Sequence, residues 1–600
     1  MNLHDLDLHQ DQGQDHDRAV IGQRILDCCL REDIRGLLSR ARQTTLPAEL
    51  AAHWPQPAEP DWLCIDHLGG GELWLPVRGG GPLQAWSAVG DRWLRRQGEH
   101  VALEQGYRRW LEHLARGLDG ESLALFADYM EEADCAVEHR RLCGAAYAAQ
   151  AGALETILDE ADWGRRLLGI DRLASYLDHP FYPTARAKSG FDAAALQGYA
   201  PEFAPRFHLR WLAVPRALLE QTSAPPALWP SFAAVGLPAA LEISHALLPV
   251  HPLTWPELEH HGLPAGCLRA PHAALEVEPT LSVRTVLCVE APRWHIKLPL
   301  LVRTLGARNL RLIKPSTIHD GHWFQTVLQA LAARDGQLGA RYIHVDEQHG
   351  GHAADARHLA YILRRYPDGL ERTTPVPVAA LASRLPDGRL LVAALAERFH
   401  AGDLLAWWQE YVDLLLAVHL RLWLVYGIAL EANQQNAVLL FEAGRPLRLL
   451  MKDNDAARLW PARFASACPD LVAHLAELRD ERIRVDGTRP LAEMFCTITL
   501  QLNMIAPLEA MAAAGLAGRA SLYALLRERL AAALDALENE GVAVDEARHF
   551  LLDAPRLPVK YLLSAGSLFS KAHSGAADIN KFYGYSAANF LQEASPCPAD

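Results

Sequence analysis

Polar side chains that could hold a cation or a phosphate gather on both sides of a short apolar segment in "YGIALEANQQNAVLLFEAGRPLRLLMKDND", residues 426–455. Asn436 begins an apolar run, "AGRP" forms a turn, and the returning run ends at Asp453, which predicts a β-hairpin. Asn436 and Asp453 would then meet at the end of the hairpin opposite its turn. An amide oxygen and a carboxylate suit Mg²⁺, which usually keeps phosphate and water as its other ligands. We therefore predict a metal site with the ligands Glu431, Asn436 and Asp453.

The same arrangement admits other interpretations. Protein kinases use an asparagine, a hairpin and then a metal-binding aspartate, so a kinase-like phosphotransferase is one hypothesis. Asn436 and Asp453 could also do no more than cap strands and turns. The hairpin alone leaves these readings open, and a second motif is needed to decide between them.

A second group of polar residues lies upstream, between Glu278 and Ile313. Ser282, Arg284 and Thr285 stand at a predicted strand start, and Lys297 stands on the next predicted strand. Hydroxyls, an ammonium and guanidinium forks on adjacent strands suit a polyphosphate. The chain has no G-x-x-x-x-G-K-[ST] and no G-x-G-x-x-G motif, so neither a P-loop nor a Rossmann site is predicted. The alternative is that these cations lie on a solvated sheet face.

Composition limits the classes of function. The net charge of −14 argues against a general affinity for nucleic acid or an anionic membrane. The N-terminus is acidic and lacks the pattern of a secretory signal. The apolar stretch 414–430 is interrupted by His419 and Arg421, which favours a buried helix over a membrane span. Ten cysteines without any C-x-x-C indicate reduced thiols, and we expect a cytoplasmic protein.

The elements that must position these residues fall into three predicted domains within 600 residues. Residues 1–165 read as mainly helical, with helices over 19–41 and 120–168 and a hairpin in "HLGGGELWLPVRGGGPLQAW". Residues 166–395 read as α+β, with strands in "FHLRWLAVP", "TVLCVEA", "WHIKLPLLV" and "RLLVAALAE". Residues 396–600 read as helix-rich, with a helix from 404 to 427 followed by the predicted metal-site hairpin.

Several segments, in order, resemble the motifs of one known family. They are "DHPFYPTARAKSGF" (178–191), "YAPEF" (199–203), "LPVHP" (248–252), "PTLSVRT" (279–285), "KLPL" (297–300), "EANQQN" (431–436), "KD" (452–453) and "INKFYGYSAANFL" (579–591). The family is that of the siderophore synthetases that work independently of nonribosomal peptide synthetases, the aerobactin-synthetase-like proteins. The resemblance covers roughly residues 165–590.

The resemblance implies an α+β fold of several domains, described for the family as a cupped hand with thumb, fingers and palm around a central cleft, and a homodimer. It implies a ligase of iron acquisition that uses ATP and Mg²⁺. A carboxylate, usually that of citrate or a citrate derivative, becomes an acyl-adenylate with release of pyrophosphate. An amine or alcohol then attacks to give an amide or an ester.

The resemblance also implies roles for individual residues. The ATP phosphates would be held by Ser282, Arg284, Thr285, Lys297 and Arg308. The nucleotide or metal would be contacted by Asn433, Gln435, Asn436 and Asp453, with Glu431 in support. The carboxylates of the acid would face His179, Arg186, Lys188 and Arg364. Catalysis would depend on Arg284, Lys297 and His179.

The chain departs from the family pattern at three places. Asn433 replaces a histidine, Tyr182 replaces the second histidine of the His-Pro motif, and Arg186-Ala187-Lys188 replaces K-x-R. Asparagine can still donate a hydrogen bond, so we expect substrate binding to persist and the rate to suffer. These departures indicate an unusual acid or a divergent subfamily, and they keep open an inactive carboxylate-binding homologue.

Overall fold

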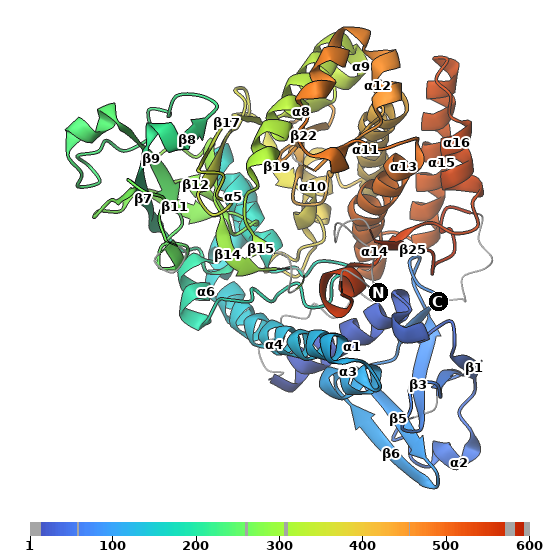
Figure 1. The fold of residues 1–600 in the computed structure, drawn as a ribbon. Coiled ribbons are helices and arrows are strands. Elements are labelled where there is room, and N and C mark those ends of the chain that lie inside the picture. Colours follow the sequence, from blue (N-terminus) through green and yellow to red (C-terminus); the bar gives the residue numbers. More distant parts are fainter. Residues whose placement is uncertain are drawn as a thin grey trace.

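The fold is mixed α and β in several bodies, as the sequence predicts (Figure 1). The computed structural model describes residues 14–56, 59–258, 262–304, 306, 310–454, 456–570 and 582–592. In Figure 1 an N-terminal unit is blue, a broad sheet is green, and a helix-rich body runs from yellow to red. The cupped-hand description and the boundaries near 165 and 395 stay predictions.

The described part of the N-terminal unit combines four helices with a six-stranded sheet of order β1-β2-β3-β5-β6, with β4 on β3. Its elements are α1 (Gln14–Arg31), β1 (Arg42–Thr44), α2 (Ala48–Ala51), β2 (Asp61–Ile65), β3 (Glu72–Gly79), β4 (Trp86–Ala88), β5 (Arg92–Gln97), β6 (His100–Gln105), α3 (Tyr107–Ala115) and α4 (Gly120–Glu155). The predicted hairpin is confirmed by the antiparallel pairing of β3 with β4. The first helix ends earlier than predicted, because Asp33 and Arg35 adopt positive φ.

A nine-stranded antiparallel sheet fills the middle of the chain, in the order β10-β7-β11-β12-β13-β18-β17-β8, with β9 on β7. Its strands are β7 (Phe207–Pro215), β8 (Leu219–Gln221), β9 (His245–Val250), β10 (Leu268–Arg269), β11 (Ala274–Pro279), β12 (Thr285–Cys288), β13 (Trp294–Lys297), β17 (Asp346–Ala353) and β18 (Ala360–Arg365). Three of the four predicted strands are confirmed here. The register sets Thr285 directly opposite Lys297, so two of the predicted phosphate ligands are cross-strand neighbours.

Shorter elements surround this sheet. They are α5 (Trp163–Ser175), α6 (Ala193–Tyr199), the pair β14 (Leu300–Arg303) and β15 (Leu310–Arg311), α8 (Pro315–Arg334) and α9 (Gly336–Gly339). The helix predicted over 120–168 is two helices, α4 and α5, with a break around Ile157–Asp159. The strand predicted in "RLLVAALAE" is wrong, because these residues form helix α10 (Leu391–Phe399). A short apolar run fits a buried helix as well as a buried strand.

The helix-rich body contains the predicted hairpin. Strands β21 (Ala437–Phe441) and β22 (Arg448–Met451) pair antiparallel, between β19 (Thr374–Pro377) and β16 (Tyr342–His344). Around them lie α11 (Leu404–Leu424), β20 (Ile428–Ala429), β23 (Arg458–Leu459), α12 (Pro461–Ala467), α13 (Arg489–Met494), α14 (Ala506–Ala513), α15 (Arg519–Asn539), α16 (Asp545–Arg548), β24 (Val559–Lys560) and β25 (Tyr583–Gly584). The hairpin prediction is confirmed.

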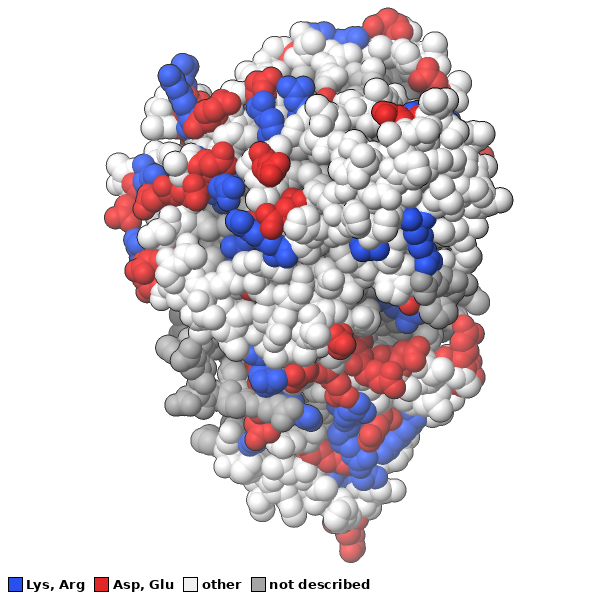
Figure 2. All heavy atoms as spheres, turned by 90° about the vertical axis from the view of Figure 1, so that its left-hand side faces the viewer, with Lys and Arg blue, Asp and Glu red and all other residues white. Residues whose placement is uncertain are grey.

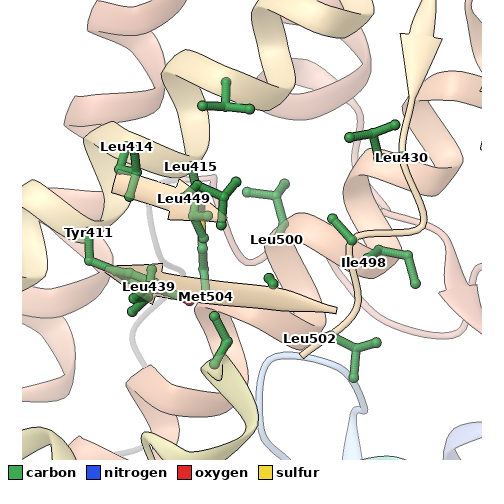
Figure 3. Packing of buried hydrophobic residues seen from close by; sticks show 14 of the residues in the cluster. Tyr411, Leu414, Leu415, Leu430, Leu439, Leu449, Ile498, Leu500, Leu502 and Met504 are labelled. Carbon is green, nitrogen blue, oxygen red and sulfur yellow. The ribbon is translucent and has the colours of Figure 1, made fainter. Parts of the chain in front are cut away.

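The core of this body forms where α11 and the hairpin meet a π-helical stretch, Phe495–Ile505 (Figure 3). Tyr411 and Leu415 of α11 pack with Leu439 and Leu449 of the hairpin. Helix Arg489–Ala513, which includes the π-helical stretch, is apolar and long enough to cross a membrane. However, 94% of an 18-residue apolar segment of this helix is buried inside the fold. The predicted burial of the apolar stretch 414–430 is confirmed in α11.

Charge is mixed over the face that carries the nine-stranded sheet. Figure 2, which views the left-hand side of Figure 1, shows basic and acidic side chains interspersed among uncharged ones. No single sign dominates this face of the described residues. The concentration of cations that a polyanionic substrate requires lies inside the molecule instead, where the predicted site residues meet.

Candidate active site

All of the predicted site residues except Arg364 and Arg308 line one cavity of about 430 Å³ between the nine-stranded sheet and the helix-rich body. A neighbouring chamber of about 270 Å³ shares six lining residues with it. The shared residues are Arg284, Lys297, Glu431, Ala456, Ile498 and Lys560. Two adjoining compartments with common walls can hold two reactants side by side.

The turn before β12 presents Ser282 and Arg284 to the cavity. The turn is closed by Thr280, whose backbone N–H donates to the carbonyl of Thr285 at 2.9 Å, and by the Ser282 hydroxyl, which accepts from the N–H of Thr285 at 3.0 Å. Its central residue, Val283, adopts φ +64°. Such backbone strain is uncommon for a β-branched residue and occurs often at functional sites.

Lys297 and Asp453 form an ion pair that joins the two predicted motifs directly. Lys297 on β13 is 3% exposed, and Asp453 follows β22 with φ +70°. Burial raises the pKa of Asp453, but Lys297, Arg364 and Arg284 outweigh that effect and lower the pKa below its usual value. The carboxylate of Asp453 is therefore ionised at neutral pH.

Arg364 lies behind Asp453 and is absent from the residues that line the cavity. Its Nε donates to Glu347 Oε1 at 2.6 Å. The other oxygen of Glu347 accepts from the backbone N–H of Asp453 at 3.1 Å. The geometry thus gives Arg364 a role in holding Asp453, and its predicted contact with the acid stays a prediction.

The polar loop before β21 is folded on the side chain of Asn433. Its Oδ1 accepts from the backbone N–H groups of Gln435 and Asn436, each at 3.1 Å. The Asn436 amide donates to the carbonyl of Glu431 at 3.3 Å, and the Asn436 carbonyl accepts from the N–H of Lys452 at 3.1 Å. Asn433 therefore holds the loop in shape, as asparagine commonly does in turns. Glu431, Asn433, Gln435 and Asn436 all line the cavity.

His179, in the loop after α5, also lines the cavity. Its Nδ1 accepts from the N–H groups of Phe181 and Tyr182, each at 3.1 Å. Burial, with the positive charges of Arg24, Lys560 and Arg31, lowers the pKa of His179 to about 3. The imidazole is therefore neutral at physiological pH, and its proton lies on Nε2.

Helix α1 of the N-terminal unit holds the His179 loop. Arg24 donates to the carbonyls of His179 at 2.7 Å, Tyr182 at 3.0 Å and Pro183 at 3.2 Å. Tyr182 itself points away from the cavity, since its hydroxyl donates to Glu132 at 2.6 Å and lies 2.8 Å from the hydroxyl of Ser567. The tyrosine at this position is a buried link between distant parts of the chain.

Two cations that were predicted to face the acid are paired with carboxylates of the protein. Arg186 donates to Asp178 Oδ1 at 2.9 Å, and Lys188 donates to Glu202 Oε1 at 2.6 Å. Both line the cavity, but both are buried with these partners. Their predicted role toward the acid stays a prediction. Arg308 lies outside the described residues, so its predicted role also stays a prediction.

The structure adds two cations that sequence reasoning missed, Arg311 of β15 and Lys560 of β24. Burial and the nearby Arg284 lower the pKa of Arg311 to about 10. Lys560 reaches the cavity because β24 pairs with β25, setting Lys560 opposite Tyr583. The tyrosine belongs to the C-terminal motif "INKFYGYSAANFL", which was the one available signal for this segment.

The cavity is net positive within an acidic protein. Among the described residues that line it are six cations and four carboxylates. Three of the carboxylates, those of Asp178, Glu202 and Asp453, are the partners of Arg186, Lys188 and Lys297. The cations of this lining, Arg284, Arg311 and Lys560 among them, therefore outnumber its carboxylates. This balance suits anionic reactants.

Comparison with known proteins places the chain among siderophore-related sequences. Residues 170–383 match the IucA / IucC family, and residues 405–573 match the family described as ferric iron reductase FhuF-like transporter. The uncharacterized protein y4xN of Sinorhizobium fredii is 30% identical over 49% of this chain and 52% of its own length, so this match spans about half of the relative. Staphyloferrin B synthase of Staphylococcus aureus is 25% identical over 66% of this chain and 71% of its own.

Solved structures share the whole fold. The ATP-bound aerobactin synthetase IucA of Klebsiella pneumoniae aligns with a TM-score of 0.68 and 21% identity, over 96% of this chain and all of that one. The described fold therefore has a counterpart across nearly its entire length.

Proposed function

Residues 170–383 match the IucA / IucC family, and from that match we propose that this chain is an ATP-dependent ligase of siderophore biosynthesis. In the proposed reaction a carboxylate oxygen of citrate or a citrate derivative attacks the α-phosphorus of ATP, and pyrophosphate leaves. An amine or hydroxyl then attacks the acyl carbon, AMP leaves, and an amide or ester remains. The names of the relatives as siderophore synthases and synthetases support ligase chemistry.

One observation carries the proposal: the ion pair of Lys297 with Asp453, which joins the 282–297 segment to the 431–453 segment across a single cavity. A nucleotide needs cations for its phosphates and a site for its metal, and these two segments supply both kinds of side chain. Had they lain on separate surfaces, no single triphosphate could have touched both. The adjoining chamber supports the presence of a second reactant beside the first.

Arg284 and Lys297 would provide most of the electrostatic stabilisation. Both line both chambers, so they stand where the phosphates would meet the carboxylate of the acid. Negative charge spreads over phosphate oxygens as the bond to the α-phosphorus forms, and fixed cations aimed at that charge lower the barrier. Ser282 would add a hydroxyl donor from the adjacent turn.

The residues present also fit Mg²⁺. Asp453 is ionised, and Glu431 and Asn436 offer further oxygen ligands on the same wall. When bound, Mg²⁺ would neutralise part of the phosphate charge. Within the protein, Lys297 holds the Asp453 carboxylate in place.

His179 would act as a hydrogen-bond donor to the acid. Its Nδ1 accepts hydrogen bonds from two backbone N–H groups, so only the Nε2–H is available to a substrate. A neutral imidazole donates a hydrogen bond without adding charge. With Lys560 on the wall shared by both chambers, this arrangement would hold the acid beside the nucleotide, and correct positioning supplies much of the rate of the second step.

Product analysis tests the proposal. The purified full chain is incubated with Mg²⁺, ATP and a panel of citrate-type acids, with and without amines and amino alcohols. We expect AMP and pyrophosphate with at least one acid. ADP without pyrophosphate would overturn the proposal in favour of a phosphotransferase, and calorimetry that finds citrate binding without ATP binding would favour an inactive carboxylate-binding homologue.

A further inference from the structure

A cluster of metal-ligating side chains lies outside the candidate active site, at the edge of the nine-stranded sheet. Glu220 of β8, His319 of α8 and His352 of β17 each place one ligand atom within 4.8 Å of the others. Glu220 Oε2 lies 3.7 Å from His319 Nε2 and 3.5 Å from His352 Nε2. None of the three lines either chamber of the candidate active site.

The two histidines lack the hydrogen-bond partners that buried imidazoles normally have. His352 is 2% exposed, and neither of its ring nitrogens has a hydrogen-bond partner. The Nε2 of His319 also has none. Buried polar atoms without partners are costly and need an explanation. A bound ion would satisfy both Nε2 atoms at once.

The fold brings the three residues together in two ways. Strands β17 and β8 pair so that His352 stands directly opposite Glu220. Helix α8 crosses above them, because β17 carries Gly350, where a Cβ would lie 2.7 Å from Ile318 of α8. Gly350 of "HGGH" (349–352) thus lets α8 approach closely enough for His319 to meet His352.

We propose that Glu220, His319 and His352 bind a divalent first-row transition-metal ion, with Zn²⁺ as the expected ion. Two imidazoles and one carboxylate match the ligand types of zinc sites that keep one position open. Metal–ligand distances near 2.0–2.1 Å in a tetrahedron put neighbouring ligand atoms about 3.3 Å apart. The separations of 3.5 and 3.7 Å lie close to that value.

The surroundings of the cluster are consistent with a cation. Asp355 Oδ1 lies 3.7 Å from His352 Nδ1, the ring nitrogen that points away from Glu220. Carboxylates in that position orient metal-bound histidines. The positive charge of Arg479 near His319 is opposed by the carboxylates of Glu220 and Asp320. The Glu220 side chain is 62% exposed, which gives an ion a path from solvent.

The ion would fasten the start of α8 to the edge of the sheet. Lys314 and Thr317, just before His319 in the chain, line the second chamber. An ion bound by His319 of α8 and by side chains of two strands would therefore fix the segment that forms this wall. The function of the ion would be structural, and it does not depend on which reaction the cavity performs.

Metal titration of the untagged full chain tests the site. After treatment with a chelator, Zn²⁺ is titrated against a chromophoric competitor, and Co²⁺ is titrated with its visible absorption as a probe of tetrahedral geometry. We expect one equivalent per chain. Glu220→Gln changes an exposed side chain without changing its shape, and it should weaken Zn²⁺ binding about 100-fold, as should His352→Ala.

The matched control is His349→Ala. His349 lies on the same strand but contacts Ser223, so this variant should bind Zn²⁺ as the parent chain does. Hydrogen exchange over residues 314–322 should slow on addition of Zn²⁺ in the parent and not in Glu220→Gln. Absence of binding in the parent, or unchanged binding in both Glu220→Gln and His352→Ala, would overturn the proposal, the latter result assigning the ion to other histidines.

Discussion

Arg284 lies where the two chambers meet, and its side chain serves both the site and the fold. It lines both chambers, and its Nη1 donates to the carbonyl of Leu312 at 2.9 Å. That hydrogen bond fixes the guanidinium against the irregular segment between β15 and α8. A cation that is fixed before the substrate arrives loses little free energy to reorganisation during the reaction.

Replacing Arg284 by alanine should abolish most adenylation while leaving the fold intact. We expect pyrophosphate release to fall about 10²–10³-fold, the typical effect of removing one fixed donor from a developing charge. The assay is coupled pyrophosphate detection, with thermal unfolding as the check on folding. Arg303→Ala is the control, since Arg303 is exposed on β14 and does not line the cavity. Turnover equal to the parent's would remove Arg284 from the site.

Asn433 takes the place of a family histidine, and its Oδ1 organises the polar loop. Asn433→Ala should loosen the loop by about 1 kcal/mol and lower the adenylation rate about 5-fold. Asn433→His should restore the rate, because an imidazole Nδ1 can accept two backbone N–H groups as His179 does. The measurement is the initial rate of pyrophosphate release at saturating ATP. Equal rates in all three chains would contradict a role for this side chain.

At the residue scale the sequence predicted the neighbours of Lys297 well and those of Arg186 poorly. The pairing of Thr285 with Lys297 follows from two short strands and one turn, which are local signals. The carboxylates that neutralise Arg186 and Lys188 are Asp178 and Glu202. Charge type alone does not tell whether a cation faces substrate or a carboxylate of its own protein.

Helices and strands position these residues. The strength of each element's sequence pattern decided whether that element could be predicted. The β21–β22 hairpin was predictable because a tight turn separates two apolar runs, whereas α10 was read as a strand because its run is short and apolar. Lys560 could not be found, because β24 has two residues and reaches the cavity only by pairing with β25.

Helix α11 carries a buried histidine that should make stability depend on pH. Burial lowers the pKa of His419 to about 4, so between about pH 6.5 and 4 the unfolded chain binds a proton that the folded chain does not. Stability therefore falls as pH falls through this range. From pH 7.5 to 5, His419 alone contributes a loss of about 2 kcal/mol.

His419→Met should remove that contribution. We expect the urea midpoint of the variant to fall less between pH 7.5 and pH 5 than that of the parent, measured by circular dichroism. His549→Met is the control, because the His549 side chain is 80% exposed. An unchanged difference between the two pH values would show that His419 does not carry this dependence.

At the scale of the whole molecule, the N-terminal unit completes the candidate active site. Buried Glu32, just after α1, accepts from the backbone N–H groups of Leu563 at 3.0 Å and Ser564 at 2.7 Å, and from the Ser564 hydroxyl at 2.7 Å. These residues follow β24, which carries Lys560 into the cavity. In Figure 1 the red segment around β25 lies beside the blue unit. The domain that the sequence described only as helical thus holds two walls of the site.

Glu32→Ala should release the β24 segment. Three hydrogen bonds to a carboxylate are lost, which costs about 2 kcal/mol or more. We expect faster proteolysis within residues 556–570 and at least a tenfold loss of adenylation, read by limited proteolysis with mass spectrometry and by pyrophosphate release. Glu49→Ala changes an exposed carboxylate of the same unit. This variant should neither speed proteolysis within residues 556–570 nor lower adenylation. Parent-like protection in Glu32→Ala would rule out this link.

The contact between Glu32 and Leu563 joins residues 531 positions apart in the chain. No periodicity or motif in the sequence indicates such a pairing. The contact also sets the order in which parts of the molecule can form during synthesis. A ribosome adds roughly 5–20 residues per second, so helix α1 emerges about half a minute to two minutes before its partner segment. Until that segment emerges, the candidate cavity lacks the wall that Lys560 provides, so we expect a chain terminated before residue 560 to be unable to catalyse the proposed reaction.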